Sequence, residues 1–174
     1  MRVTGRAGPG DAGPVTSPRV RALEPDGFRP ATDLFRASLH LPPLGDQEWG
    51  RRGGRHVPGR TFGSFDDAAG REELVGTAMS FPSRVTVPGG AVLPTAAVSL
   101  VGVRADRTRR GHLSALMRVQ LDDARARGDV LATLTASETG IYGRFGYGVA
   151  SRARSVRLRA GAELHGRAPG LSLI

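Results

Sequence analysis

The chain has 174 residues, which is enough for one domain with a sizeable core but too short for two full domains. It contains no cysteine, so a disulfide framework and a thiolate metal site are excluded. Its formal net charge is +9 and all 25 basic residues are arginine, which fits nucleic acid, a smaller polyanion such as a phosphorylated cofactor, or merely a solvated surface.

The N-terminal segment carries no signal for a membrane or for export. No apolar run reaches the roughly 18 residues that a membrane span needs, and the first residues lack an apolar region typical of a secretory signal. Residues 1–18 are rich in Gly, Pro, Ser and Thr, so we expect a disordered leader. We expect a cytoplasmic protein, and the sequence leaves secretion open.

A short strand and a helix are expected next. Residues 20–23 can form the strand, and a helical pattern with one apolar face runs from position 26 or 27 until Leu41-Pro42-Pro43 ends it. Residues 44–59 are polar and contain Gly53-Gly54. They are predicted to form a loop.

The middle of the chain is rich in predicted strands. Thr61–Phe65 and Leu74–Val87 have the composition of strands, and the turn signal "VPGG" joins the second of them to Ala91–Val103 in a hairpin. Within this arm, residues 96–103 are predicted to form a buried central strand.

The last third of the chain contains one clear helix. Five apolar residues share one helical face: Leu113, Leu116, Met117, Leu121 and Ala124. Gly128 is a suitable stop. Residues 130–136 then indicate a second buried strand, and residues 150–160 alternate as an exposed strand does.

The junction between the central strand and this helix has the character of an anion site. Arg109 and Arg110 precede the helix, and Gly111 lies at its first turn. The first amides of a helix lack internal partners, and the helix dipole adds partial positive charge there. Arginine at that end opposes the dipole, so stability alone does not explain it, although arginine is also simply abundant in this chain. The pattern predicts a phosphate or pyrophosphate site.

Four well-known motifs of nucleotide-binding, hydrolytic and metal-dependent proteins are absent from the sequence. The P-loop pattern, a dinucleotide fingerprint after a strand, a nucleophile elbow and H-E-x-x-H do not occur, and the four histidines are scattered, so we expect no metal centre. A nucleic-acid-binding domain would need arginines on one face with stacking aromatics. The aromatic residues are few, and both tyrosines fall in one turn, "YGRFGYG" at 142–148.

The order of strand, R-R-G helix, strand and tyrosine turn resembles the GNAT family of acyl-CoA N-acyltransferases, and in particular its Eis branch. The strings "LPTAAVSLVGV", "RRGHLSALM" and "ASETGIYGRFGYG" carry the resemblance. It implies an α/β (α+β) fold with a mixed, mostly antiparallel central sheet flanked by helices. The expected N-acetyltransferase domain spans residues 19–160, and residues 161–174 would be a tail, the start of a link to a second domain.

The resemblance implies acetyl-CoA as the co-substrate and assigns site residues. The backbone of Val101, Gly102 and Val103 would bind the pantetheine arm. The pyrophosphate would be wrapped by Arg109, Arg110, Gly111, His112, Leu113 and Ser114. Ser137 and Glu138 would also line the coenzyme site. Thr108 departs from the family pattern, which usually has Arg or Gln there and would add a side-chain contact.

Tyr142 would be the general acid. A phenol has a pKa near 10, so it stays protonated at neutral pH and can return a proton to a departing CoA thiolate. The turn glycines allow the tight path that aims one hydroxyl at the sulfur. Tyr147 is expected to pack with Phe145 against the sheet, and a packing role is the alternative for Tyr142.

The implied reaction is direct acetyl transfer to a primary amine of an aminoglycoside, a polyamine or a lysine, with Phe81, Ser99 and Leu100 lining the acceptor site. Full Eis-branch proteins have further domains, whose terminal carboxylate serves as general base, and we expect them to be homo-oligomers. The base is unassigned here unless Ile174 or another carboxylate takes that role. The alternative function is a truncated or degenerate CoA-binding module without turnover.

Overall fold

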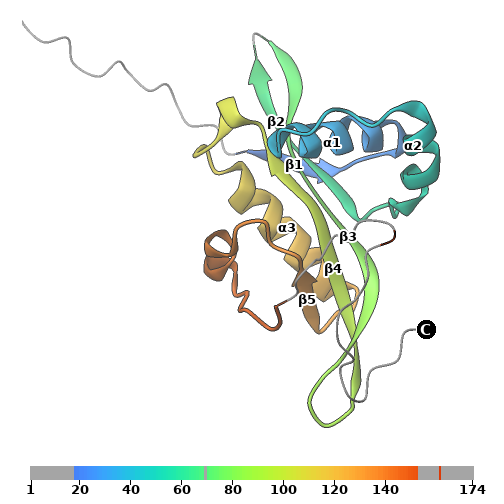
Figure 1. Ribbon diagram of the computed structural model, residues 1–174. Helices are drawn as coiled ribbons and strands as arrows, with labels where there is room; N and C mark the ends of the chain where they lie inside the picture. The colour runs from blue at the N-terminus through green and yellow to red at the C-terminus, as the bar shows by residue number, and fades with distance from the viewer. Residues whose placement is uncertain (1–17, 69, 153–160, 162–174) are drawn as a thin grey trace, which may run out of the picture.

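The computed structural model describes residues 18–68, 70–152 and 161, and these residues form one sheet with helices on both faces (Figure 1). The strands are β1 (Arg19–Ala22), β2 (Thr61–Ala68), β3 (Arg71–Thr86), β4 (Val92–Val103) and β5 (Leu131–Leu134). They lie side by side in chain order; neighbours from β1 to β4 are antiparallel, and β5 joins β4 in parallel. The expected fold class, a mostly antiparallel mixed sheet flanked by helices, is confirmed.

The helices are α1 (Pro25–Ser38), α2 (Asp46–Arg52) and α3 (His112–Ala126). Phe28 and Ala31 of α1 pack on Phe65, whereas Leu116 of α3 packs on Phe62. Because side chains alternate along a strand, these two phenylalanines of β2 point to opposite faces, so the sheet separates the two helices. None of the helices in the described ranges is long and apolar enough to cross a membrane.

Two elements differ from the sequence prediction. Residues 44–59 contain α2 and a 3-10 turn at Gly53–Arg55 rather than only a loop. Helix α2 has seven residues and none of them is buried, so the sequence has no apolar periodicity that would predict this helix. Strand β5 is shorter than predicted and borders the described part of the sheet, where Leu131 is 38% exposed, so it is not a buried strand throughout.

Three predictions lie outside the described residues. These are the disordered leader, most of the exposed strand at 150–160, and the tail from 161 onward, of which only Gly161 is described.

Strand β4 contains an irregularity in its pairing with β3. Thr77 pairs with Gly102 and Met79 with Ser99, so two residues of β4 lie opposite a single residue of β3. This is a β-bulge, and it places Leu100 in the left-handed region with φ +50°. A bulge bends and twists the strand that carries it, and here Leu100 lies two residues beyond the last β4–β5 pair, Val98 with Leu134.

A buried ion pair joins the segment before β2 to the segment before β5. Arg60 Nη1 lies 3.0 Å from Asp129 Oδ2, and the two side chains are only 10% and 7% exposed. Two charges taken out of water depend on each other, because either of them alone would remain buried without compensation. The pair therefore ties two loops that are far apart in the sequence.

We predict that Arg60→Met or Asp129→Asn alone lowers the free energy of unfolding by about 3–5 kcal/mol, because each leaves one uncompensated buried group. Chemical denaturation measures the loss. The matched control is Arg21→Met, which removes an exposed ion pair to Glu72 and should cost less than about 1 kcal/mol. Equal losses for the buried and the exposed pair would contradict this account.

Candidate functional site

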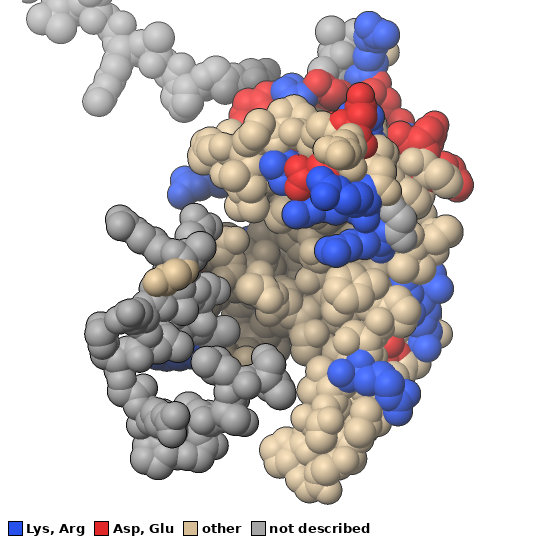
Figure 2. Space-filling view, turned by 45° about the vertical axis from the view of Figure 1, so that its right-hand side comes forward, with Lys and Arg blue, Asp and Glu red and all other residues tan. Residues whose placement is uncertain are grey.

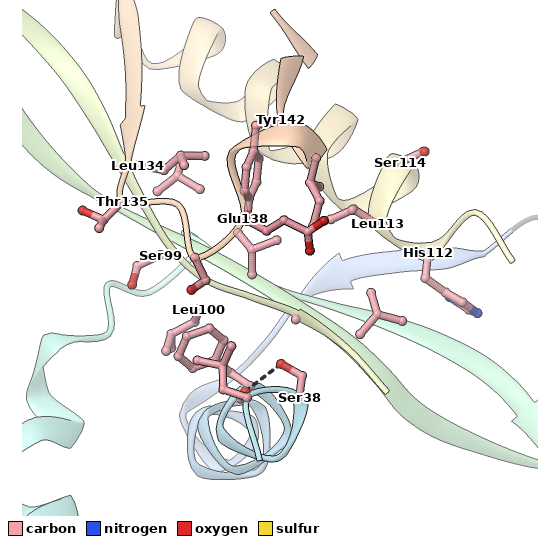
Figure 3. Close-up of a pocket in the computed structure, with 18 of the residues that line it drawn as sticks. Ser38, Ser99, Leu100, His112, Leu113, Ser114, Leu134, Thr135, Glu138 and Tyr142 are labelled. Atoms are coloured by element: carbon pink, nitrogen blue, oxygen red, sulfur yellow. Dashed lines mark hydrogen bonds between the residues drawn. The ribbon is translucent and has the colours of Figure 1, made fainter. Parts of the chain in front are cut away.

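A cavity of about 1130 Å³ lies where β4 and β5 separate. In Figure 3, Leu134, Thr135 and Tyr142 approach it from the side of β5, and Ser38, Ser99 and Leu100 approach it from the other side. The predicted site residues that line it are Phe81, Ser99, Leu100, Val101, Gly102, Val103, Arg109, Gly111, His112, Leu113, Ser114, Ser137, Glu138 and Tyr142. The structure thus brings together every predicted site residue except Arg110.

The cavity exists because β5 stops following β4. Pairing between the two strands covers Thr95–Val98 of β4 and then ends. Residues 99–103 therefore have β3 on one side and, within the described chain, no strand on the other. A strand edge of this kind offers backbone N–H and C=O groups to an extended ligand.

Gly102 allows α1 to lie close to this edge of β4. A Cβ at this position would meet Ser38 Oγ at 2.7 Å and Phe35 Cα at 3.2 Å. Ser38 is itself held, because its hydroxyl donates to the Phe35 carbonyl at 2.7 Å. The missing side chain therefore sets the distance between helix and strand at the cavity wall.

The start of α3 forms the second wall. Gly111 is the N-cap residue with φ +86°, a left-handed conformation that glycine adopts without strain. The amides of His112, Leu113 and Ser114 occupy the first turn, where helical N–H groups have no internal acceptor. No acidic residue lies in this turn. The first turn can therefore accept an anion.

The two arginines before α3 have different surroundings. Arg109 lines the cavity and has φ +61°, which is uncommon for a residue with a side chain. Arg110 is outside the lining, and its Nη1 lies 3.5 Å from Asp66 Oδ2, a carboxylate that also pairs with Arg107 at 3.2 Å. Arg109 thus lines the cavity, whereas Arg110 lies outside the lining beside Asp66.

At His112, the backbone amide in the first turn of α3 matters more for the cavity than the imidazole ring does. The ring is buried, points away from the cavity group in Figure 3, and its Nδ1 lies 2.9 Å from Ser64 Oγ of β2. Burial is the main reason that the pKa of His112 is lowered, and nearby Arg110 and Arg107 lower it further against the opposing effect of Asp66. A neutral imidazole thus anchors the start of α3 to the sheet.

The tyrosine turn brings one phenol to the cavity. Tyr142 lies between two 3-10 turns, Thr139–Ile141 and Gly143–Phe145, and is half-buried. Burial raises its pKa above the usual value of 10.0. The ring of Tyr147 packs edge-on against it, with centroids 5.9 Å apart. Burial, aided by Tyr142, raises the pKa of Tyr147 to about 12. Tyr142 lines the cavity and Tyr147 does not.

Several lining residues were not found by sequence reasoning. They are Phe35, Ser38 and Leu39 of α1 and its end, and Thr133, Leu134, Thr135, Ile141 and Arg144 around β5 and the turn. The β5 residues lie in a predicted strand and could have been proposed from its position beside the site. The α1 residues give no such signal, because only the tertiary fold brings them to β4.

The surface around the site is unevenly charged. Figure 2 shows a hollow whose visible walls are mostly uncharged, with basic side chains gathered above it.

Among the described residues, no group of three or more His, Asp or Glu side chains is arranged to hold a metal ion.

The wedge between β4 and β5, the open first turn and the tyrosine turn can be compared with known proteins. The profile of the family described as "Acetyltransferase (GNAT) domain" matches residues 19–150. The chain belongs to the GNAT acetyltransferase family. GNAT acetyltransferases use acetyl-CoA as a co-substrate, which corresponds to the expectation from the sequence.

Similar proteins include N-acetyltransferases named Eis, as the sequence resemblance implied. The chain is 43% identical over 106 residues to N-acetyltransferase Eis of Mycobacterium tuberculosis, covering 60% of this chain and 26% of that protein. It is 56% identical over 90 residues to an N-acetyltransferase of Streptomyces avermitilis, covering 52% of this chain and 21% of that one. The chain thus spans about a quarter or less of these relatives.

A solved structure has a similar fold over part of its chain. Eis1 from Mycobacterium abscessus is 39% identical and superposes with a TM-score of 0.65 over 76% of this chain and 32% of that one. A predicted acetyltransferase with acetyl-CoA from Clostridium acetobutylicum has a TM-score of 0.59 at 9% identity, a likeness of fold alone.

We predict that Gly102→Ala lowers the free energy of unfolding by about 1–3 kcal/mol, because the added methyl group pushes α1 away from β4. Denaturant titration gives the value. Gly140→Ala is the matched control, since its Cβ would have no neighbour within 4 Å; it should change stability by less than about 0.5 kcal/mol. If the two variants are equally stable, the close approach of α1 does not depend on the missing side chain.

Proposed function

We propose that this chain binds acetyl-CoA in the cavity between β4 and β5 and transfers the acetyl group to a primary amine. The observation that carries the proposal is the composition of that one cavity, which is lined by the unpaired edge of β4, the first turn of α3 and Tyr142. Membership of the GNAT family and the N-acetyltransferase names of the relatives support the same reaction class.

The binding roles follow from the chemistry of each wall. The pantetheine arm carries amide groups, and the backbone of Val101, Gly102 and Val103 can pair with them as a neighbouring strand would. The pyrophosphate is anionic, and the first-turn amides of α3 with Arg109 supply donors and positive charge. Ser137 and Glu138 line the same cavity after β5.

The proposed chemistry is a direct transfer. The neutral amine nitrogen attacks the thioester carbonyl, a carbon–nitrogen bond forms, and the carbon–sulfur bond breaks. Backbone amides near Val103 would polarise the carbonyl oxygen. The chain has no cysteine to form an acylated thiol, which favours attack on the bound thioester.

Tyr142 is the proposed proton donor to the departing thiolate, while the proton of the amine passes to water. Its burial raises the pKa of the phenol above its usual value, so the phenol is protonated throughout the neutral range. A free thiol has a pKa near 8.5. The raised pKa of Tyr142 thus keeps the proton available until the thiolate forms.

We predict that Tyr142→Phe lowers the rate of acetyl transfer by about 10²–10⁴ while the affinity for acetyl-CoA stays the same, because only the donated proton is lost. Thiol release measures the rate and calorimetry the affinity. In the parent chain the rate should not decline between about pH 7 and 9.5, because the raised pKa keeps the phenol protonated.

Tyr147→Phe is the control and should retain the parent rate, because this ring does not line the cavity. A Tyr142→Phe variant that is as fast as the parent would exclude the acid role. Tight binding of acetyl-CoA without thiol release from any amine would instead favour the CoA-binding module that does not turn over.

A second prediction separates the two arginines. Arg109→Ala should weaken acetyl-CoA binding about tenfold or more, as expected for a lost charge-assisted hydrogen bond, and added salt should weaken the parent but affect this variant less. Arg110→Ala should change the affinity much less, because its partner is Asp66. Calorimetry at two salt concentrations gives both values, and the opposite ranking would move the pyrophosphate site away from Arg109.

A further inference from the structure

A second pocket, of about 620 Å³, adjoins the first. Phe35, Phe81, Ser99 and Leu100 line both of them. The two spaces therefore meet at the β4 bulge, with the proposed acetyl-CoA site on one side and the second pocket on the other. If acetyl transfer occurs as proposed, a molecule in the second pocket lies next to the thioester end of the acetyl-CoA bound in the first pocket.

The charge of the second pocket has one sign. Three of its lining residues are arginines, namely Arg36, Arg52 and Arg55, and none of the described residues that line it is acidic. A polycation such as a polyamine or an aminoglycoside would meet repulsion here, whereas a carboxylate or phosphate would be attracted.

Two of these arginines can bind an incoming anion. Arg55 is exposed and makes no ion pair within the described ranges. Arg52 pairs with Glu48 at 3.1 Å, but this is a surface contact between i and i+4 positions with the arginine side chain 55% exposed. Such pairs contribute little to stability, so a ligand anion can compete. A guanidinium group matches phosphate and carboxylate geometry with two parallel donors.

The segment that carries Arg52 and Arg55 is held in place by packing. His56, the next residue, stacks on Phe28 of α1 with ring centroids 4.8 Å apart and an angle of 11°. Its Nε2 lies 3.2 Å from Thr32 Oγ1, and its Nδ1 lies 3.1 Å from the Gly53 carbonyl. The arginines thus extend from a segment that is fixed to α1, not from a free loop end.

On the basis of the acetyl transfer proposed above, we propose that the acceptor is a primary amine that also carries an anionic group. This group is a phosphate or a carboxylate, and Arg52 and Arg55 bind it. The anion lies toward the α2 side of the second pocket, and the amine lies toward Ser99 and Leu100, where the two pockets meet. This selects small zwitterionic amines over polycationic acceptors such as polyamines and aminoglycosides.

Matched pairs of amines test the proposal on the full 174-residue chain. O-phosphoethanolamine is compared with ethanolamine, and 4-aminobutyrate with butylamine, by thiol release and by calorimetry on the chain saturated with CoA. We expect at least one anionic partner to exceed its neutral partner about tenfold or more in kcat/KM and affinity. The pair with the larger ratio distinguishes phosphate from carboxylate. Spermidine and kanamycin should bind more weakly than the preferred anionic amine.

The Arg52→Gln/Arg55→Gln double variant should reduce the preference to less than about threefold, because one or two charge-assisted contacts are lost. Arg125→Gln is the matched control, an exposed arginine at the end of α3 outside both pockets, and should keep the preference. A ratio near one in the parent, tighter binding of spermidine or kanamycin, or an unchanged preference in the double variant would overturn the proposal.

Binding of acetyl-CoA is measured separately, which distinguishes two failures. If the chain binds O-phosphoethanolamine or 4-aminobutyrate through Arg52 and Arg55 but does not bind acetyl-CoA, the anion site stands and the acetyltransferase proposal fails. If acetyl-CoA binds and neutral amines are acetylated equally well, the acetyltransferase proposal stands and the anion site fails.

Discussion

The separation of β4 from β5 is the constraint on which the site depends. Parallel pairing ends at Val98 and Leu134, and two residues later the bulge at Leu100 bends β4. A non-glycine residue in the left-handed region costs about 1–2 kcal/mol, and β4 carries that strain while its pairing with β3 resumes at Gly102. Without the separation, β5 would cover the edge of β4 that borders the cavity.

Helices on both faces of the sheet border this opening. Helix α3 begins at its rim, with Gly111 turning the chain and His112 tying the first turn to Ser64 of β2. On the other face α1 lies against Gly102. The start of α3, the end of α1 and the edge of β4 are therefore all fixed to one sheet around the cavity.

The sequence predicted the elements whose patterns are local. The apolar face of Leu113, Leu116 and Met117 identified α3, and the turn signal at 87–90 identified the β3–β4 hairpin. The Eis-like strings identified the family and contain 17 of the 26 residues that line the cavity. The rest depends on distant contacts. A leucine gives no sign of a left-handed backbone at position 100, and the sequence does not show that Arg110 contacts Asp66 whereas Arg109 lines the cavity. Arg52 and Arg55 line a pocket only because their segment packs on α1.

The buried ion pair of Arg60 and Asp129 bears on the opening between β4 and β5 because it fixes the start of β5. It fixes the chain just before β5, near the end where β4 and β5 are still paired. Strand β5 and the tyrosine turn therefore form an arm that is anchored at its base and has its far end at Tyr142. The buried pair thus fixes the paired end of β5, whereas the chain from Leu134 to Tyr142 continues beyond the last β4–β5 pair.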